Sequence, residues 1–402
     1  MVKTQTFDFV ILGAGIIGLS VAKTLLQQYP NCRICIIEKE PHIGLHSSGR
    51  NSGVLHSGIY YPENTLKAKV CAKGAQLMTD FCHQNDLPIK AYGKVIIPLK
   101  QDDDPLLETL HTRGKNNGAD VHIIDKTELK HIEPQAYTIT GRALHSPQTA
   151  VINPKAILNC LVERLSQKAV SFHTNAQQYQ VDPQNDCITM NGQHIHYTTL
   201  YNCTGLYADH IAKRFKLADE YTILPFKGSY FQLSKKSDLH FNGLIYPVPD
   251  LNVPFLGIHT VKDMNGSVYF GPSAIPVLGR ENYHSIKGVK ASEAIEIGTH
   301  LSKQYWFNQQ GFRQYAHSEL KKSLKSQFLK HAQALVPNLQ PKHLEPSQKV
   351  GIRAQLVNTK THQLEMDFIV KRLENTVHVL NAVSPAFTSA FEFSRLIVSE
   401  EI

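Results

Sequence analysis

Three glycines near the amino terminus carry the clearest chemical signal in the sequence. Gly13, Gly15 and Gly18 form a G-x-G-x-x-G pattern after a predicted strand and at the start of a predicted helix. The first glycine permits a tight turn, the second lets a pyrophosphate approach the backbone, and the third lets helix pack on strand. Backbone amides at the start of such a helix bind phosphate. The pattern predicts a dinucleotide-binding site.

An acidic residue strengthens this prediction. Glu38 ends the second predicted strand, about 20 positions after the glycines, where a carboxylate binds the ribose hydroxyls of a dinucleotide. Three further features favour FAD over NAD. The bare stretch 49–61, GRNSGVLHSGIYY, would let a flavin lie against main chain. A strand ends at Thr204-Gly205, and the last predicted helix follows 381–390, NAVSPAFTSA, so that its first amides would stabilise negative charge on a flavin.

Composition limits the remaining possibilities. The chain has 402 residues, of which 42% are hydrophobic and 19% charged, as in a globular protein. The net charge of +8 would attract an anionic substrate or an anionic membrane surface, but the basic residues are scattered and do not indicate nucleic acid binding. Seven cysteines without regular spacing argue against a secreted disulfide framework. Cys32 and Cys35 lie in a predicted strand and point to opposite faces, so we expect no metal site there.

The apolar segment at the amino terminus does not resemble a signal peptide or membrane anchor. Asp8 precedes it, Lys23 follows its densest part, and no cleavage site follows. No stretch approaches the ~20 apolar residues that span a bilayer. We therefore expect a cytoplasmic protein and leave open peripheral contact with the inner membrane.

The predicted elements indicate two interleaved domains. The fold class we expect is α/β, with a Rossmann-like, two-dinucleotide-binding FAD domain interleaved with a mixed α+β substrate domain. We assign residues 1–90, 145–220 and 345–402 to the FAD domain, and residues 91–144 and 221–344 to the substrate domain. Helices are predicted at 63–86, 104–118, 153–169, 289–304, 318–335 and 386–399. Strands are predicted at 7–12, 32–40, 91–99, 349–357, 366–371 and 376–382, and residues 221–285 are rich in strands.

Longer segments resemble one family along the whole chain. HSSGRNSGVLHSGIYYPENTLKAKVC (46–71), PFKGSYF (225–231), YPVPDLNVPFLGIHT (246–260) and GIRAQLV (351–357) resemble the L-2-hydroxyglutarate dehydrogenases/oxidases of the D-amino-acid-oxidase-like group. The resemblance implies oxidation of (S)-2-hydroxyglutarate to 2-oxoglutarate by hydride transfer to flavin N5. It also implies a small dicarboxylate substrate and an electron acceptor, either oxygen or a quinone. The chain departs from the family at Lys227, where arginine is usual, and at Phe387 and Phe391, where smaller residues are usual.

The glycine pattern and the resemblance together predict the residues that bind FAD. They lie in the first turn, at the end of the second strand, in the glycine-rich stretch and before the last helix. The predicted set is Gly13, Gly15, Ile16, Ile17, Gly18, Glu38, Lys39, Ser48, Arg50, Asn51, Ser52, Gly53, Ala176, Thr204, Gly205, Ser384, Pro385, Ala386, Thr388 and Ser389.

Oxidation of a 2-hydroxy acid requires a base for the hydroxyl proton and a cation for the α-carboxylate. Histidine suits the first task because its pKa lies near physiological pH, and His56 and His259 fall in the matched segments. Arg353 is predicted to bind the α-carboxylate, since guanidinium pairs with carboxylate through two hydrogen bonds.

Three further residues are candidates for contact with substrate. Tyr60 is predicted to hydrogen-bond it, and Lys227 and Arg280 are candidates for its distal carboxylate. The sequence leaves three alternatives open: an amino-acid or amine oxidase of the same fold, a glycerol-3-phosphate dehydrogenase-like flavoenzyme, and a non-catalytic flavin-binding scaffold.

Overall fold

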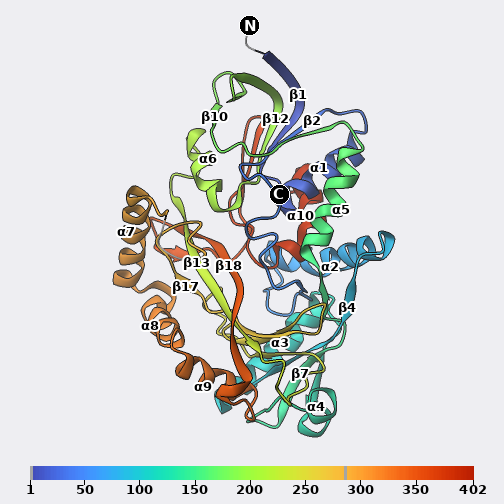
Figure 1. Ribbon diagram of the computed structural model, residues 1–402, viewed down its shortest axis with the longest axis vertical. Helices are drawn as coiled ribbons and strands as arrows, with labels where there is room; N and C mark the ends of the chain where they lie inside the picture. Colours follow the sequence, from blue (N-terminus) through green and yellow to red (C-terminus); the bar gives the residue numbers. More distant parts are fainter. Residues whose placement is uncertain (1–2, 285–287) are drawn as a thin grey trace.

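The computed structural model describes residues 3–284 and 288–402, and two large sheets organise it. An eight-stranded, mainly parallel sheet occupies the upper half of Figure 1, and long antiparallel strands run down through the lower half. In spatial order the path of the first sheet is β10 (Tyr179–Asp182), β11 (Cys187–Met190), β12 (Gln193–Asn202), β1 (Lys3–Leu12), β2 (Ile34–Ile37) and β9 (Val170–His173). From the carboxy-terminal part, β21 (Thr376–Val379) pairs with β12, and β20 (Val370–Leu373) pairs with β21.

Four helices pack on one another beside this sheet. These are α1 (Ile16–Gln28), α2 (Leu66–Gln84), α5 (Pro154–Ser166) and α10 (Ala386–Val398). Asn153 caps the start of α5, because its Oδ1 accepts hydrogen bonds from the amides of Lys155 and Ala156. Helix α10 lies against both α1 and α2. A Cβ atom at Gly74 of α2 would lie 2.5 Å from Ser389 Cα, so this close crossing of α2 and α10 requires glycine.

The second sheet has six strands and is antiparallel. Its path is β15 (His259–Lys262), β16 (Val268–Gly271), β13 (Tyr221–Leu233), β18 (Leu344–Asn358) and β19 (Gln363–Leu364), and β17 (Ile275–Pro276) pairs with β13. Helices α7 (Ala291–Phe307), α8 (Phe312–Lys322) and α9 (Lys325–Leu335) lie to one side of these strands in Figure 1. Helix α6 (Ala208–Arg214) connects β12 to β13.

Two small sheets complete the lower half. The first is formed by β14 (Leu244–Pro247), β5 (Lys94–Ile97), β7 (Arg142–Ser146) and β6 (His122–Asp125), with α3 (Asp104–Asn116) and α4 (Lys126–Ile132) beside it. The second is formed by β3 (Val54–Leu55), β8 (Ala150–Ile152) and β4 (Ile89–Ala91). Strand β3 is part of the glycine-rich stretch 49–61, so this three-stranded sheet places the stretch between the two halves of the molecule.

The predicted α/β fold class is confirmed, and most predicted elements are present. The predicted helix 318–335 is instead two helices, α8 and α9, because Leu324 is extended with φ −81° and ψ 125°. Leu320 and Leu324 are both exposed, so no packing of these side chains holds the segment in one continuous helix. The predicted opposite orientation of Cys32 and Cys35 is confirmed, since they pack in different core clusters.

The exact domain division stays a prediction. Strands β18 and β19 pair within the second sheet, although the predicted boundary at residue 345 assigned them to the FAD domain.

Across the described residues, we find no helix with both the length and the apolar character needed to cross a bilayer.

Candidate functional site

The first turn has the geometry of a dinucleotide cradle. Gly13 has φ +97°, and a Cβ atom there would lie 2.6 Å from the carbonyl oxygen of Cys203. A Cβ atom at Gly15 would lie 2.9 Å from Ser48 Oγ, and one at Gly18 would lie 2.0 Å from the carbonyl oxygen of Gly13. Each of the three glycines therefore meets the steric requirement that the pattern predicts.

Glu38 lies at the end of β2 and faces this turn. Its carboxylate accepts hydrogen bonds from the amides of Ala14 at 2.9 Å and Glu40 at 3.0 Å. The amide of Ala176 donates to the carbonyl oxygen of Glu38, so Ala176 lies at the same edge of the sheet. Lys39 turns toward a surface ion-pair network with Glu40 and Glu281.

Three residues of this network are spaced closely enough to bind a metal ion, but a lysine ammonium group already pairs with the carboxylates. Glu40, His46 and Glu281 place their ligand atoms within 4.8 Å of one another. The ammonium group of Lys39 already pairs with both carboxylates, so an ion would have to displace it.

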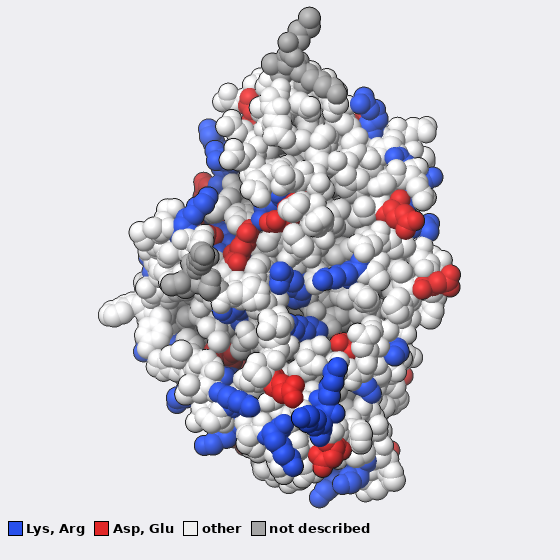
Figure 2. Space-filling view, viewed as in Figure 1, with Lys and Arg blue, Asp and Glu red and all other residues white. Residues whose placement is uncertain are grey.

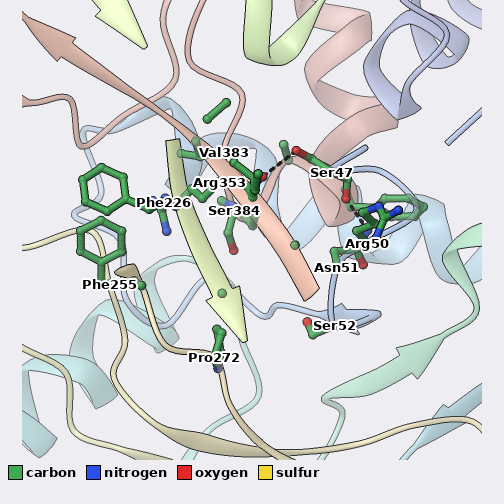
Figure 3. A pocket seen from close by; sticks show the side chains of 18 of the residues that line it. Ser47, Arg50, Asn51, Ser52, Phe226, Phe255, Pro272, Arg353, Val383 and Ser384 are labelled. Atoms are coloured by element: carbon green, nitrogen blue, oxygen red, sulfur yellow. Dashed lines mark hydrogen bonds between the residues drawn. The ribbon is translucent and has the colours of Figure 1, made fainter. Parts of the chain in front are cut away.

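A cavity of about 320 Å³ begins at the glycine turn and continues to the second sheet. Figure 3 shows Phe226, Phe255 and Arg353 on one side, and Ser47, Arg50 and Asn51 on the other. Of the predicted FAD-binding residues, twelve line it: Gly15, Ile16, Ile17, Ser48, Arg50, Asn51, Ser52, Gly205, Ser384, Pro385, Ala386 and Thr388. Two helices, α1 and α10, thus direct their amino-terminal ends at one cavity, which favours negative charge at both places.

The remaining predicted FAD-binding residues lie next to the cavity. Gly13, Gly53 and Thr204 lie in loops next to lining residues and Gly18 lies in the first turn of α1, while Glu38, Lys39 and Ala176 lie beyond the glycine turn. Ser389 is different, because it packs against Gly74 of α2 and does not line the cavity. Its position indicates a structural role in the crossing of the two helices.

The glycine-rich stretch is fixed by its own polar side chains. Asn51 Nδ2 donates to the carbonyl oxygen of Ser48 at 2.7 Å, and Asn51 Oδ1 accepts from the amide of Gly53 at 2.9 Å. The amide of His56 donates to Thr388 Oγ1 at 3.1 Å. The stretch therefore presents its backbone to the cavity and is tied to α10 at its far end.

His259 is held in one tautomer. Its Nδ1 lies 2.9 Å from the carbonyl oxygen of Gly257, which can only accept, so Nδ1 carries the proton and Nε2 is unprotonated. Its ring stacks on Tyr246 with centroids 4.0 Å apart, and both residues line the cavity. Burial lowers the pKa of His259 to about 4.

His56 lies across the same cavity. Its Nε2 is 3.2 Å from Ser384 Oγ. Burial lowers the pKa of His56 to about 3, and the positive charges of Lys94, Arg353 and Lys67 contribute to the shift. Both histidines are therefore neutral at physiological pH, as a proton acceptor must be.

Arg353 faces the cavity from β18. It lies opposite Phe226 of β13, its Nε donates to Gln355 Oε1 at 3.0 Å, and its guanidinium lies 5.2 Å from the centroid of the Phe255 ring. Burial lowers the pKa of Arg353 to about 10, which leaves it charged at neutral pH. The position suits the predicted binding of a carboxylate.

The site has an excess of buried positive charge. Lys67, Lys94 and Arg353 all act on His56. Burial lowers the pKa of Lys67 to about 7, so this residue is partly charged at neutral pH, whereas Lys94 and Arg353 stay mostly charged with pKa values of about 8 and about 10. Glu319, an acidic residue of the cavity lining, already binds Lys322 and the amide of Ala274 at 2.7 Å each. Figure 2 shows lysine and arginine side chains around a hollow near the middle of this face. An anion would be stabilised here.

Three predicted substrate residues do not reach the cavity. Arg280 is buried and pairs with both oxygens of Asp209, at 2.8 and 2.9 Å. Lys227 lies between Phe226 and Gly228 on β13, and since these two face the cavity, its side chain faces the other way. Tyr60 is buried behind Tyr246 and does not line the cavity. We withdraw all three as substrate ligands.

The sequence reasoning missed several residues of the cavity wall. These are the aromatic residues Phe226, Tyr230, Tyr246, Phe255 and Tyr315. Strand alternation within PFKGSYF would have favoured Phe226 and Tyr230 over Lys227. No local signal marked Tyr246 or the buried Lys94 behind it.

Comparison with known proteins identifies the family. The profile of the DAO family, described as FAD dependent oxidoreductase, matches residues 8–400. The chain belongs to this family of FAD-dependent oxidoreductases. The cofactor is accordingly FAD, and the glycine cradle, Glu38 and the two helix amino termini fit it.

Relatives and solved structures agree with this assignment. The L-2-hydroxyglutarate dehydrogenase of Indibacter alkaliphilus is 34% identical over 96% of this chain and 96% of its own, and that of Salmonella houtenae is 32% identical over 98% and 93%. The fold matches L-α-glycerophosphate oxidase from Mycoplasma pneumoniae, with a TM-score of 0.74 and 21% identity over 98% of this chain and 94% of the other. It also matches glycine oxidase from Geobacillus kaustophilus, with a TM-score of 0.70 and 14% identity over 98% and 94%.

The two cavity histidines make the free energy of unfolding depend on pH. The folded protein protonates them only near pH 3 to 4, whereas the unfolded chain does so near 6.5. Protonation therefore favours unfolding, and the free energy of unfolding falls as the pH decreases from 6.5 toward 4. For His259→Gln we expect this slope to decrease by up to about 1.4 kcal/mol per pH unit, measured by urea unfolding of the FAD-loaded protein.

His131→Gln, at an exposed position on α4, is the control and should keep the wild-type slope. Equal slopes for His259→Gln and the wild type would contradict the prediction.

Proposed function

We propose that this chain oxidises (S)-2-hydroxyglutarate, also called L-2-hydroxyglutarate, to 2-oxoglutarate with FAD as its cofactor. The relatives named L-2-hydroxyglutarate dehydrogenase support the substrate. The observation that carries the proposal is the excess of positive charge around His56, where Lys67, Lys94 and Arg353 converge. Such a site favours a substrate with two carboxylates.

The cofactor and the side chains have separate tasks in this proposal. Bound FAD supplies the hydride acceptor. The amides at the start of α1 and the cradle of Gly13, Gly15 and Gly18 would hold its pyrophosphate, and Glu38 would bind its ribose. The amino terminus of α10 lies where it would stabilise negative charge on the ring.

Arg353 and His259 act on the substrate. The guanidinium of Arg353 binds the α-carboxylate through two hydrogen bonds, which fixes the hydroxyl-bearing carbon in the cavity. Nε2 of His259 accepts the hydroxyl proton as the hydride leaves, because its Nδ1 proton is engaged with Gly257. His56 is the second candidate for the base: when its Nε2 donates to Ser384 Oγ, its Nδ1 is the unprotonated nitrogen, and Nδ1 has no partner in the described part of the chain.

Electrons then pass to an acceptor, for which we propose oxygen or a quinone. Contact with a membrane surface, and with it a quinone, is supported by the exposed apolar side chains of Ile295, Trp306 and Leu320 on α7 and α8. Lysines such as Lys303 and Lys321 lie on the same helices and would favour anionic lipid.

The fold also matches glycine oxidase, so oxidation of an amino acid is the second candidate. An amino acid brings an ammonium group, which the positive charges near His56 disfavour. A dianionic hydroxy acid has no such group, and the electrostatics therefore favour the first candidate.

Anaerobic addition of (S)-2-hydroxyglutarate to the purified, FAD-loaded protein should bleach the flavin absorbance. Glycine and glycerol 3-phosphate, added in the same way, should leave the spectrum unchanged. Bleaching by glycine alone would transfer the assignment to amino-acid oxidation. A flavin that no small acid reduces would favour a non-catalytic scaffold.

Arg353→Met should raise KM for (S)-2-hydroxyglutarate by about 10- to 100-fold, since two hydrogen bonds to a carboxylate are lost. Steady-state kinetics with an artificial electron acceptor provides the measurement. Arg313→Met, on α8 and bound to backbone oxygens of α7, is the matched control. An unchanged KM in Arg353→Met would remove the residue from the substrate site.

His259→Gln should lower kcat by about 10²- to 10⁴-fold while FAD remains bound, because the variant lacks the proton acceptor. The rate of anaerobic flavin reduction measures the step directly. His56→Gln, compared in parallel, assigns the base to the histidine whose loss has the larger effect. Wild-type reduction rates in His259→Gln would exclude it as the base.

A further inference from the structure

Lys94 occupies an unusual position on β5, directly behind the cavity. Its side chain is 1% exposed, and Nζ has no hydrogen-bond partner among residues 3–284 and 288–402. The hydroxyl groups of Tyr60 and Tyr246 are likewise buried without partners in this part of the chain. A buried ammonium group without a carboxylate is costly, so its retention calls for a reason other than stability.

Aromatic rings connect this charge to the cavity wall. Nζ of Lys94 lies 4.9 Å from the centroid of the Tyr60 ring and 5.2 Å from that of Tyr246. Such contacts offset part of the desolvation cost. Tyr246 stacks on His259 at 4.0 Å, so Lys94 contacts a ring that itself contacts His259. The charge therefore lies one ring behind the proposed base.

Burial lowers the pKa of Lys94 to about 8, so its ammonium form still predominates at neutral pH. The neighbouring ionisable groups do not neutralise this charge. Burial is the main cause of the low pKa of both histidines; Lys94 lowers both values further, and His259, Arg353 and Lys67 also lower that of His56. Burial raises the pKa of Cys71 to about 12, and it raises the pKa values of Tyr60 and Tyr246 well above their usual value, so these groups are neutral. Lys67 donates to the carbonyl oxygen of Met366 and, through its charge, adds to the positive potential at His56.

We propose that Lys94 is a positioning residue whose ammonium group, without a carboxylate partner, reinforces the burial that keeps His259 and His56 unprotonated in the free enzyme. Its charge raises the cost of protonating either imidazole in the free enzyme, so the base is available over a wider pH range. A dianion in the cavity then offsets this potential and makes the imidazole a stronger proton acceptor. The identity of the dianion rests on the proposed function. The role of the Lys94 charge rests on its position next to Tyr246 and His259.

Lys94→Met tests the inference, since methionine has similar length and no charge. Because an unpaired buried charge is removed, Tm should stay equal or rise. The acidic limb of the pH profile of kcat/KM should move to higher pH by about 0.5 to 1 unit, as a like charge near the base is lost. Lys262 lies on the same strand as His259, with its Nζ over the Tyr92 ring, and Lys262→Met is the control. This variant should change neither Tm nor the acidic limb of the pH profile.

A second readout separates this inference from the proposed function. In Lys94→Met the histidines should protonate closer to pH 6.5, so the pH dependence of the free energy of unfolding becomes shallower, with or without a substrate. If the wild type fails to oxidise (S)-2-hydroxyglutarate but this slope changes, the proposed function fails and the role of Lys94 stands.

A lower Tm with an unchanged pH profile and slope would overturn the inference and make Lys94 a structural residue. If Lys94→Met does not fold, Lys94→Arg and Lys94→Gln replace it. The charged variant should keep the wild-type acidic limb and the neutral one should shift it, while equal limbs in both would overturn the inference.

Discussion

The packing of α10 between α1 and α2 is the constraint on which the site depends. It brings the carboxy-terminal segment 384–388 to the glycine turn near residue 13, although the two are far apart in the sequence. Phe391 contributes directly, because its ring lies 5.1 Å from that of Phe81 on α2 and 4.9 Å from Lys23 Nζ on α1. Without this contact the two helix amino termini would not meet at one cavity.

The same packing explains a departure from the related family. Phe391, where the resemblance led us to expect a smaller residue, packs in the core between the helices. Phe387, a second position where a smaller residue was expected, lines the cavity. Two neighbouring substitutions therefore have different consequences, one for helix packing and one for the shape of the substrate cavity.

The FAD-binding half could be predicted from sequence because its signals are local. The turn at Gly13, the carboxylate of Glu38 and the cap at Asn153 each depend on residues within one or two elements. The substrate half depends on tertiary placement. Arg280 appeared to be a free cation until the structure paired it with Asp209, more than 70 positions away. Lys227 and Phe226 are neighbours on one strand and therefore face opposite sides of the sheet. This alternation can be predicted from the sequence, but we chose Lys227 for its charge alone.

The buried cations show why this fold can host different substrates. The cradle for FAD is built from backbone and short side chains, whereas the positive charge around His56 comes from Lys67, Lys94 and Arg353 on α2, β5 and β18. These elements belong to three different parts of the molecule, so their side chains can change without disturbing the cofactor site. The charge of Lys94, which lies behind the cavity wall, acts on the histidines, while Tyr246 forms the cavity surface in front of it. Lys67 and Lys94 do not line the cavity, so part of the charge that would favour a dianion comes from residues behind its wall.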